Sequence, residues 1–299
     1  MTYDIVLLSA DKFLAPNREA NPYFSNVILE DGLVKEALEK EGFTTKIVSW
    51  SDRHFDFSKT KAVLVRTIWD YFERFEEFSR WLEEIKTKTV LINSYETIRW
   101  NMNKHYLLDL EKAGINIPQS LFFKQGKEID FETVFSTLNV SEIVVKPTIS
   151  GAAYQTFRLS SVSGNKTKDT INALLQEKDF IVQPFIESIV SFGEISIMLI
   201  GGQYTHAVLK KAKRGDYRVQ DDHGGTVEPF EPTAKQIAFA KQAYDACNPK
   251  PLYARVDIVV DNENQLAVSE LELIEPEFWY RFHQPAAEEL ARQLKNTLS

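Results

Sequence analysis

The sequence predicts an α/β fold, because strand-like and helix-like patterns alternate from the start of the chain. Residues 4–9 form an apolar run typical of a buried strand, and residues 31–41 have helical spacing that ends at Gly42. Two further strands are expected over residues 43–50 and 61–66. Strand, helix, strand and strand in this order favour a parallel sheet in an N-terminal domain.

The composition fits a globular protein of two or three compact units. The chain has 299 residues, of which 43% are hydrophobic and 26% are charged. Its 35 basic and 43 acidic residues leave a net charge of −8, which gives no support for a surface that binds nucleic acid or an anionic membrane. The single cysteine, Cys247, leaves no partner for an intrachain disulfide and favours a cytoplasmic setting.

The segment after the third strand contains candidate substrate-binding residues. Ligands of open α/β sheets bind beyond the carboxyl ends of the strands, where Arg66, Asp70 and Tyr71 stand. Arg66 is suited to hold a substrate carboxylate with two hydrogen bonds, Asp70 to take an amine, and Tyr71 to wall the pocket. The alternative is a helix start that Asp70 caps, with aromatic core residues around it.

Two lysines occupy positions that suit phosphate binding. Lys104 lies near the start of a helix expected over residues 100–114, where a lysine is usually exposed. Lys146 ends the apolar strand 142–147, so its side chain points toward whatever lies beyond that strand. The loop 148–156 is built of small residues, which lets backbone N–H groups approach phosphate oxygens, but it matches neither a Walker nor a Rossmann pattern.

The second half of the chain begins with a break in the strand pattern. Pro184 follows an apolar strand and cannot donate to a ladder, so the chain is expected to leave the sheet there. A hairpin is expected over residues 193–209, with Glu194 at its start. The basic segment 210–218 ends at Arg218 and is either a solvated loop or a phosphate-binding loop.

Residues 255–276 predict a β-hairpin that carries three acids. Strand alternation places Asp257 on one strand and Glu270 and Glu272 on the other, so that the three carboxylates can converge on one face. Like charges at this spacing repel by roughly 1 kcal/mol or more unless a cation lies among them. Mg²⁺ has the required preference for carboxylate and phosphate oxygens. The alternative is an exposed edge hairpin with scattered acids.

Taken in order, these motifs resemble the ATP-grasp superfamily. The series comprises Asn101 with Lys104, the strand end Val144–Pro147, the run Val182–Ile186, Glu194, Arg218, Asp257, and Glu270 with Glu272. The chain looks similar to the branch of prokaryotic glutathione synthetase and the ribosomal-protein glutamate ligase, and to the ATP-grasp ligases of D-cycloserine biosynthesis. The resemblance implies an N-terminal parallel-sheet domain over residues 1–97 and two lobes, residues 98–185 and 186–299, that clasp ATP.

The resemblance also implies a role for each matching residue. The implied nucleotide-binding residues are Lys104, Lys146, Ser150, Gly151, Ala152, Thr156, Gln183, Phe185, Ile186, Glu194 and Arg218. Among them, the two lysines would hold the α- and β-phosphates, Gln183 the adenine edge and Glu194 the ribose hydroxyls. Arg218 and Lys146 would act in catalysis. Asp257, Glu270 and Glu272 resemble the Mg²⁺ ligands, although the glutathione synthetase pattern has Asn where this chain has Glu272.

The implied activity is that of an ATP- and Mg²⁺-dependent carboxylate–amine ligase. Such an enzyme phosphorylates the carboxylate of a small amino-acid-like substrate, and an amine then attacks the acyl phosphate. Three alternatives stay open: ATP-dependent cyclisation of an O-ureido-serine-like substrate, a nucleotide-binding module without turnover, and a kinase or hydrolase on the same scaffold. Neither nucleic acid nor a membrane is expected as a partner, and a homo-oligomer is compatible with the sequence.

Overall fold

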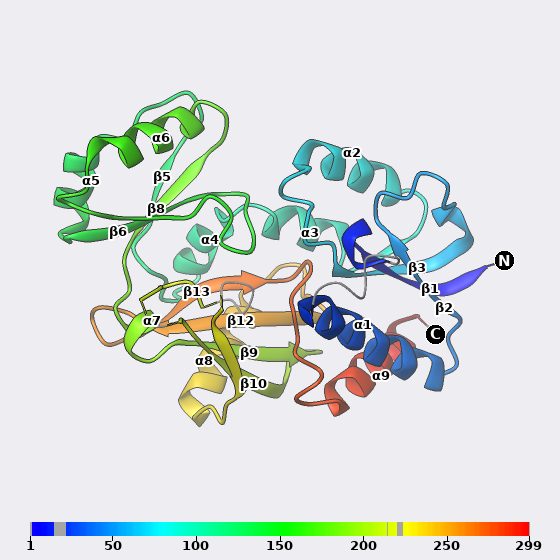
Figure 1. Cartoon of the computed structure of the whole chain (residues 1–299). Helices are drawn as coiled ribbons and strands as arrows, with labels where there is room; N and C mark the ends of the chain where they lie inside the picture. The colour runs from blue at the N-terminus through cyan, green and yellow to red at the C-terminus, as the bar shows by residue number, and fades with distance from the viewer. Residues whose placement is uncertain (1, 15–21, 214, 220–223, 299) are drawn as a thin grey trace.

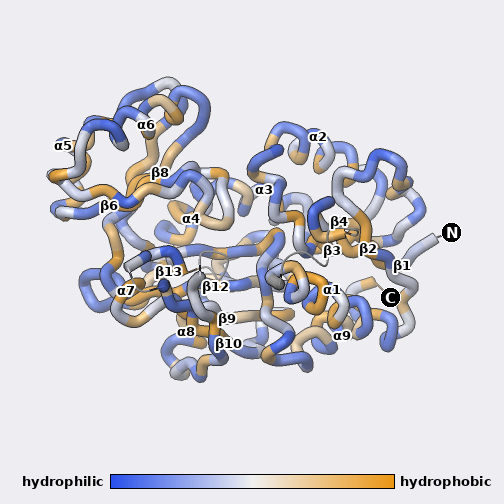
Figure 2. The backbone as a smooth tube through the Cα atoms, viewed as in Figure 1, coloured by the Kyte–Doolittle hydropathy of each residue, from blue (hydrophilic) through white to orange (hydrophobic). Residues whose placement is uncertain are grey.

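The computed structural model describes residues 2–14, 22–213, 215–219 and 224–298, and within them it contains three β-sheets (Figure 1). The sheets follow one another along the chain, each contributes to a buried hydrophobic cluster, and one further cluster joins strands of the N-terminal and C-terminal sheets. Figure 2 shows hydrophobic residues gathered along the strands and hydrophilic residues on the outer turns of the helices. Among the described residues, no helix combines the length and apolar character needed to cross a membrane.

The N-terminal sheet is parallel, as the sequence predicts. Its strand order is β2-β1-β3-β4, and every pairing is parallel. The strands are β1 (Tyr3–Ser9), β2 (Thr45–Ser49), β3 (Thr60–Thr67) and β4 (Val90–Ile92). Helix α1 (Pro22–Lys40) begins earlier than predicted, and Gly42 follows it with a φ of 93°. Helix α2 (Phe75–Ile85) buries Phe78, Leu82 and Ile85.

The predicted single helix over residues 100–114 is wrong, because the chain forms two short helices there. Helix α3 (Tyr95–Asn101) and helix α4 (Tyr106–Lys112) are separated by a turn. The backbone N–H of Lys104 donates to the carbonyl of Thr148, 2.8 Å away, instead of to a carbonyl one helical turn earlier. Lys104 therefore stands in a turn that the central sheet holds in place.

The central sheet is antiparallel and has the strand order β5-β8-β6-β7. Its strands are β5 (Leu121–Phe123), β6 (Glu142–Pro147), β7 (Phe157–Ser160) and β8 (Phe180–Pro184), and its helices are α5 (Phe131–Leu138) and α6 (Asn165–Leu175). Both helices contribute to one buried cluster with the strands. Strand β8 ends at Pro184, where the sequence predicts that the chain leaves the sheet.

The C-terminal sheet is antiparallel and has the strand order β11-β10-β9-β12-β13. Its strands are β9 (Glu194–Ile200), β10 (Gln203–Lys211), β11 (Thr226–Pro229), β12 (Tyr253–Val260) and β13 (Leu266–Glu272). Helices α7 (Ser188–Ser191), α8 (Ala234–Asp245) and α9 (Pro285–Leu298) complete this part of the chain. The hairpin predicted over residues 255–276 is confirmed as β12 and β13.

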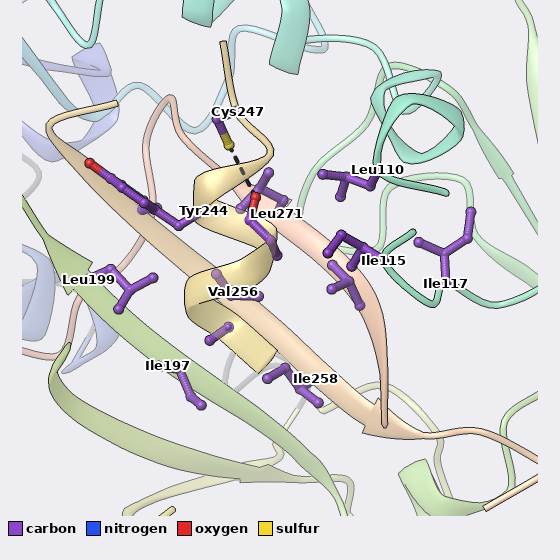
Figure 3. Close-up of a cluster of buried hydrophobic side chains, with 14 of the residues drawn as sticks. Leu110, Ile115, Ile117, Ile197, Leu199, Tyr244, Cys247, Val256, Ile258 and Leu271 are labelled. Atoms are coloured by element: carbon purple, nitrogen blue, oxygen red, sulfur yellow. Dashed lines mark hydrogen bonds between the residues drawn. The ribbon is translucent and has the colours of Figure 1, made fainter. Parts of the chain in front are cut away.

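One face of this sheet is covered by α8 and α4. Val256, Ile258 and Leu271 point toward α8 and lie in one cluster with Leu110 of α4 (Figure 3). These residues alternate along their strands with Asp257, Glu270 and Glu272. Burial of the apolar set against the helices therefore turns the three acids to the opposite face.

The N-terminal and C-terminal parts are joined through buried contacts. Helix α9 packs along α1, so the last helix lies beside the first (Figure 1). The Tyr253 hydroxyl on β12 lies within hydrogen-bonding distance of the carbonyls of Val65, Ile92 and Ile274. These contacts hold the end of the parallel sheet against the strands that carry the acids.

Candidate active site

The three acids of the hairpin converge in the structure. Asp257 lies directly opposite Glu270, and Arg255 lies opposite Glu272, with a register shift of one residue beyond Asp257. One carboxylate oxygen from each of the three acids lies within 4.8 Å of the other two. The arrangement supplies hard oxygen donors on one face of the sheet, as the alternation of the sequence indicates.

Asp257 is held by a complete set of hydrogen bonds. Its Oδ1 accepts from the Ser196 hydroxyl at 2.6 Å and from Arg255 Nε at 2.9 Å. Its Oδ2 accepts from Lys210 Nζ and Arg255 Nη2, both at 2.8 Å. Burial opposes ionisation, but the charges of Arg255 and Lys210 outweigh it and hold the pKa of Asp257 below its usual range. A carboxylate with four donors has no position left for another ligand in this arrangement.

Glu270 and Glu272 each have one engaged oxygen. Glu270 Oε1 accepts from Lys104 Nζ at 2.8 Å, and Glu272 Oε1 is paired with Arg255. Burial opposes ionisation of Glu270, but Lys104 and Lys146 outweigh it and lower its pKa. Burial raises the pKa of Glu272 to about 7, although Arg255 opposes this shift. The second carboxylate oxygen of Glu270 and that of Glu272 have no hydrogen-bond partner among the described residues.

Both predicted phosphate-binding lysines face this cluster. Lys104 is 6% exposed, and its ammonium also donates to the carbonyl of Ser150 at 2.8 Å. Lys146 is half-buried at the end of β6, and its ammonium has no hydrogen bond within the part of the chain that the structure describes. Burial lowers the pKa of Lys146, while the charge of Glu270 acts in the opposite direction.

The predicted lid, residues 150–156, contacts the N-terminal part through Tyr154, whose ring centroid lies 5.5 Å from that of Phe72. Ala152, Ala153 and Gln155 all have positive φ angles, 47°, 54° and 50°, which non-glycine residues rarely adopt. The Ser150 hydroxyl donates to the Pro147 carbonyl at 3.0 Å, and the Thr156 carbonyl accepts from the Tyr217 hydroxyl at 3.3 Å. A loop of small residues is thus ordered by contacts at both ends.

Gln183, Phe185 and Ile186 lie where β8 meets the C-terminal sheet, and all three are nearly buried. Gln183 Nε2 donates to the Ser120 hydroxyl at 2.9 Å. The Arg158 guanidinium carbon lies 3.6 Å from the ring centroid of Phe185, and Ile186 joins an apolar cluster with residues of β12 and β13. The side-chain amide of Gln183, which is predicted to bind the adenine edge, is thus bonded to a serine in this structure.

Both carboxylate oxygens of Glu194, the residue predicted to bond the ribose hydroxyls, are engaged by neighbouring side chains. Its side chain is 11% exposed, its Oε2 pairs with Lys210 at 2.6 Å, and its Oε1 accepts from the Ser269 hydroxyl at 2.6 Å. Lys210 joins Glu194 to Asp257, so Glu194 supports the acid network. Arg218 is paired with Asp216 at 2.7 Å and is 39% exposed, so its side chain reaches solvent near the lid contact of Tyr217.

Two of the predicted substrate residues are held within the N-terminal part. Arg66 is 2% exposed and pairs with Asp31 of α1 at 3.3 Å, because the end of β3 lies under that helix instead of facing a pocket. Asp70 accepts from Trp50 Nε1 at 2.8 Å and from Arg74 at 3.0 Å. In this structure each of the two groups predicted to bind the substrate is therefore paired with a counter-charge of its own domain.

Tyr71 does reach the candidate site. It is 4% exposed and lines a small pocket of about 30 Å³ with Lys104, Ser150, Gly151 and both glutamates of β13. The complete lining is Tyr71, Asn101, Met102, Lys104, Tyr106, Ser150, Gly151, Glu270, Leu271, Glu272, Ile274 and Glu275. The pocket therefore joins the end of the parallel sheet, the lid and the acid hairpin.

Sequence reasoning missed the roles of Arg255, Asn101 and Glu275. Arg255 precedes Asp257 by two residues, so strand alternation alone places it on the same face. Asn101 donates to the Leu271 carbonyl at 2.8 Å and accepts from the Leu273 N–H at 2.9 Å, a contact across 170 residues that no local pattern indicates. Glu275 is signalled only as a third acid that follows the two on β13.

Two family models match this chain, and the first ends where the N-terminal sheet ends. Residues 5–93 match the N-terminal domain of D-cycloserine synthetase DcsG, and residues 102–274 match the RimK-like ATP-grasp domain. The chain belongs to the RimK-like ATP-grasp family. The ATP-grasp fold and the ligase class implied by the resemblance are thereby confirmed.

The relatives of this ATP-grasp protein include one whose name states a pathway. The cycloserine biosynthesis protein DcsG of Streptomyces lavendulae is 27% identical over 280 residues, covering 88% of this chain and 92% of that protein. The crystal structure of D-cycloserine synthetase DcsG matches with a TM-score of 0.88 at 24% identity, covering 99% of both chains. D-alanine–D-alanine ligase from Bacillus anthracis, complexed with ATP, matches with a TM-score of 0.67 at 14% identity, covering 99% of this chain and 97% of that one.

Proposed function

We propose that this protein is an ATP- and Mg²⁺-dependent carboxylate–amine ligase for a small amino-acid-like substrate. The observation that carries the proposal is the meeting of Lys104 with Glu270 at 2.8 Å, beside the group of three acids. A cationic wall that suits a polyphosphate and an acidic wall that suits a divalent ion thus share one pocket. Phosphoryl transfer needs both walls, because the enzyme acts mainly by positioning and charge neutralisation.

The donor set fits a hard divalent ion. The second oxygens of Glu270 and Glu272 lie within the acid group, while Asp257 is held by Arg255, Lys210 and Ser196. Glu270 and Glu272 would hold the ion first, with Asp257 joining when its cations shift. When bound, Mg²⁺ supplies charge neutralisation for the phosphate oxygens.

The chain's own residues would then position the reactants. Lys104 and Lys146 bind the α- and β-phosphates, and Arg218 faces the γ-phosphate. A substrate carboxylate oxygen forms a bond to the γ-phosphorus, the bond from that phosphorus to the bridging oxygen breaks, and ADP leaves. A neutral amine then forms a C–N bond with the acyl carbon, the bond from that carbon to the phosphate oxygen breaks, and inorganic phosphate leaves while the nitrogen gives up a proton.

The relation to DcsG supports an amino-acid-like substrate. It also supports a second candidate, the ATP-dependent cyclisation of an O-ureido-serine-like substrate, in which carboxylate and nucleophile belong to one molecule. A nucleotide-binding module without turnover is the third candidate. The three differ in their products: a new amide, a ring, or no ADP.

Incubation with ATP, Mg²⁺ and a panel of amino acids and amines tests the proposal. We expect ADP and a new amide by mass spectrometry, and we expect Glu270→Gln to abolish both while its circular dichroism stays that of the wild type. ADP with a stable phosphorylated product and no need for an amine would indicate a kinase instead. No ADP with any member of the panel would contradict ligase activity on amino-acid-like substrates.

A further inference from the structure

An acid just beyond the hairpin has no part in the proposed chemistry. Glu275 follows Glu272 by three residues and is half-buried in the pocket that Lys104 and Tyr71 also line. Its backbone position is fixed, because its carbonyl accepts from Trp69 Nε1 at 2.9 Å. The segment after β3 and the segment after β13 therefore meet at this residue.

Among the described acids that line this pocket, Glu275 forms no ion pair, although the charge of Lys104 acts on it. Glu270 is paired with Lys104, and Glu272 is paired with Arg255. No hydrogen bond or ion pair from another described residue reaches the Glu275 carboxylate. Burial, with Glu272 and Glu270 adding to it, raises the pKa of Glu275 well above its usual value. A half-buried carboxylate in such surroundings is stabilised by a positively charged or N–H-bearing ligand.

The same divalent ion does not account for Glu275. Among the described residues, the acids whose oxygens lie within 4.8 Å of one another are Asp257, Glu270 and Glu272. Glu275 lines the same pocket but lies outside this group. It lines this pocket together with Tyr71 and the lid residue Gly151.

We propose that Glu275 accepts hydrogen bonds from the attacking amine, beside the substrate carboxyl group that becomes phosphorylated. This inference rests on the proposed function and adds the amine side of the site. The attacking nitrogen must come within about 3–3.5 Å of the acyl carbon, so the group that holds it must share the pocket with the γ-phosphate. An N–H-bearing ligand beside Glu275 favours its ionised form, and an ionised carboxylate is acceptor-only, so it selects N–H donors with strong, charge-assisted bonds.

Glu275→Gln tests the assignment, with Glu263→Gln in the exposed β12–β13 turn as the matched control. Each variant is measured in three ways: calorimetric binding of Mn²⁺ with AMPPNP, trapping of the acyl phosphate by hydroxylamine, and amine-dependent product by mass spectrometry. The trapping and product assays use the amino acids that give ADP with the wild type, at saturating concentration. Hydroxylamine is a small neutral nucleophile that needs no ammonium site.

For Glu275→Gln we expect nucleotide binding and hydroxamate within about threefold of wild type, and product formation reduced roughly ten- to hundredfold. Glu275→Asp keeps the charge and should recover part of the loss. Unchanged product formation would overturn the assignment. So would an equal fall in nucleotide binding, which would place Glu275 at the metal or the phosphates. If the wild type gave no ADP, the ligase proposal and this assignment would both fall.

Discussion

Arg66 shows how burial assigns a structural role to a single charged residue. It forms an ion pair with Asp31, and its guanidinium carbon lies 5.2 Å from the ring centroid of Tyr280. The side chains of both partners are at most 5% exposed. Because both groups are shielded from water, each depends on the other for its counter-charge. The pair therefore links α1 to β3 and has a mainly structural role.

Replacing Arg66 with Met is therefore expected to lower stability and to leave ATP binding unchanged. The unpaired Asp31 carboxylate should reduce the free energy of unfolding by about 3–5 kcal/mol in urea titrations. The double variant Arg66→Met with Asp31→Asn should lose less, because no buried charge is left. A rise in the KM of an amino-acid substrate without a loss of stability would restore the role of substrate clamp.

At the scale of elements, β13 is the edge strand that carries two acids, and its free edge is covered by side chains. Asn101 bonds to Leu271 and Leu273, and the Tyr106 hydroxyl accepts from the Leu271 N–H at 3.0 Å. At the other end, Asn116 Nδ2 donates to the Leu266 carbonyl at 2.9 Å. These contacts fix the strand from which Glu270 and Glu272 project.

Asn101→Leu should weaken metal binding and lower the free energy of unfolding. Two buried backbone groups lose their partners, at about 1–3 kcal/mol each. Mn²⁺ titration monitored by electron paramagnetic resonance should show weaker binding, because the acids of β13 move. Asn116→Leu is the control, since it frees a carbonyl of the same strand far from the acids. Equal Mn²⁺ binding in both variants would show that the Asn101 contact does not position the acids.

The lid and the segment after β3 form a second unit at this scale. A Cβ atom added at Gly151 would lie 2.9 Å from Cε1 of Phe72. The centroid of the Phe72 ring also lies 5.5 Å from that of Tyr154. Two lid residues, Gly151 and Tyr154, therefore pack on this ring. A larger residue at position 151 therefore requires the Phe72 ring or the lid to shift.

Gly151→Ala is expected to push the lid away from Phe72 and to weaken AMPPNP binding. The steric conflict should cost about 1–3 kcal/mol, which calorimetry would detect as roughly a tenfold loss of affinity or more. Adding Phe72→Ala should recover much of the loss, because the ring that causes the conflict is gone. No recovery in the double variant would mean that glycine is needed for another reason.

At the scale of the whole molecule, buried polar contacts hold the C-terminal sheet to the segment that returns to α1. His206 on β10 donates through Nε2 to the Phe278 carbonyl at 2.6 Å, and its ring stacks on His283 with centroids 5.0 Å apart. Burial lowers the pKa of His206 to about 4. The neutral ring is part of the folded structure.

Acidification should therefore destabilise the protein through His206. The unfolded state takes up a proton near the ordinary pKa of about 6.5, whereas the folded state does so only near 4. The stabilising contribution is present above pH 6.5 and falls by about 3 kcal/mol as the pH drops through this window. Urea unfolding of His206→Gln should lack this part of the pH dependence. Parallel curves for the wild type and the variant would refute it.

The sequence by itself determined the elements and the faces of the strands. Alternation along residues 255–276 places Asp257, Glu270 and Glu272 together, and the strand and helix pattern of the first 66 residues indicates the parallel sheet. These features follow from periods of 2 and 3.6 residues, which are local properties of the chain.

Only the tertiary structure decided which charges meet. Lys104 reaches Glu270 across 166 residues, Arg66 pairs with Asp31 on α1, and Glu275 lines the pocket without an ion pair to any residue that the structure describes. Burial and counter-charge depend on packing between distant elements, and no local period reports them. The break between α3 and α4 also depends on a distant contact, because the Lys104 N–H donates to the carbonyl of Thr148, just after β6.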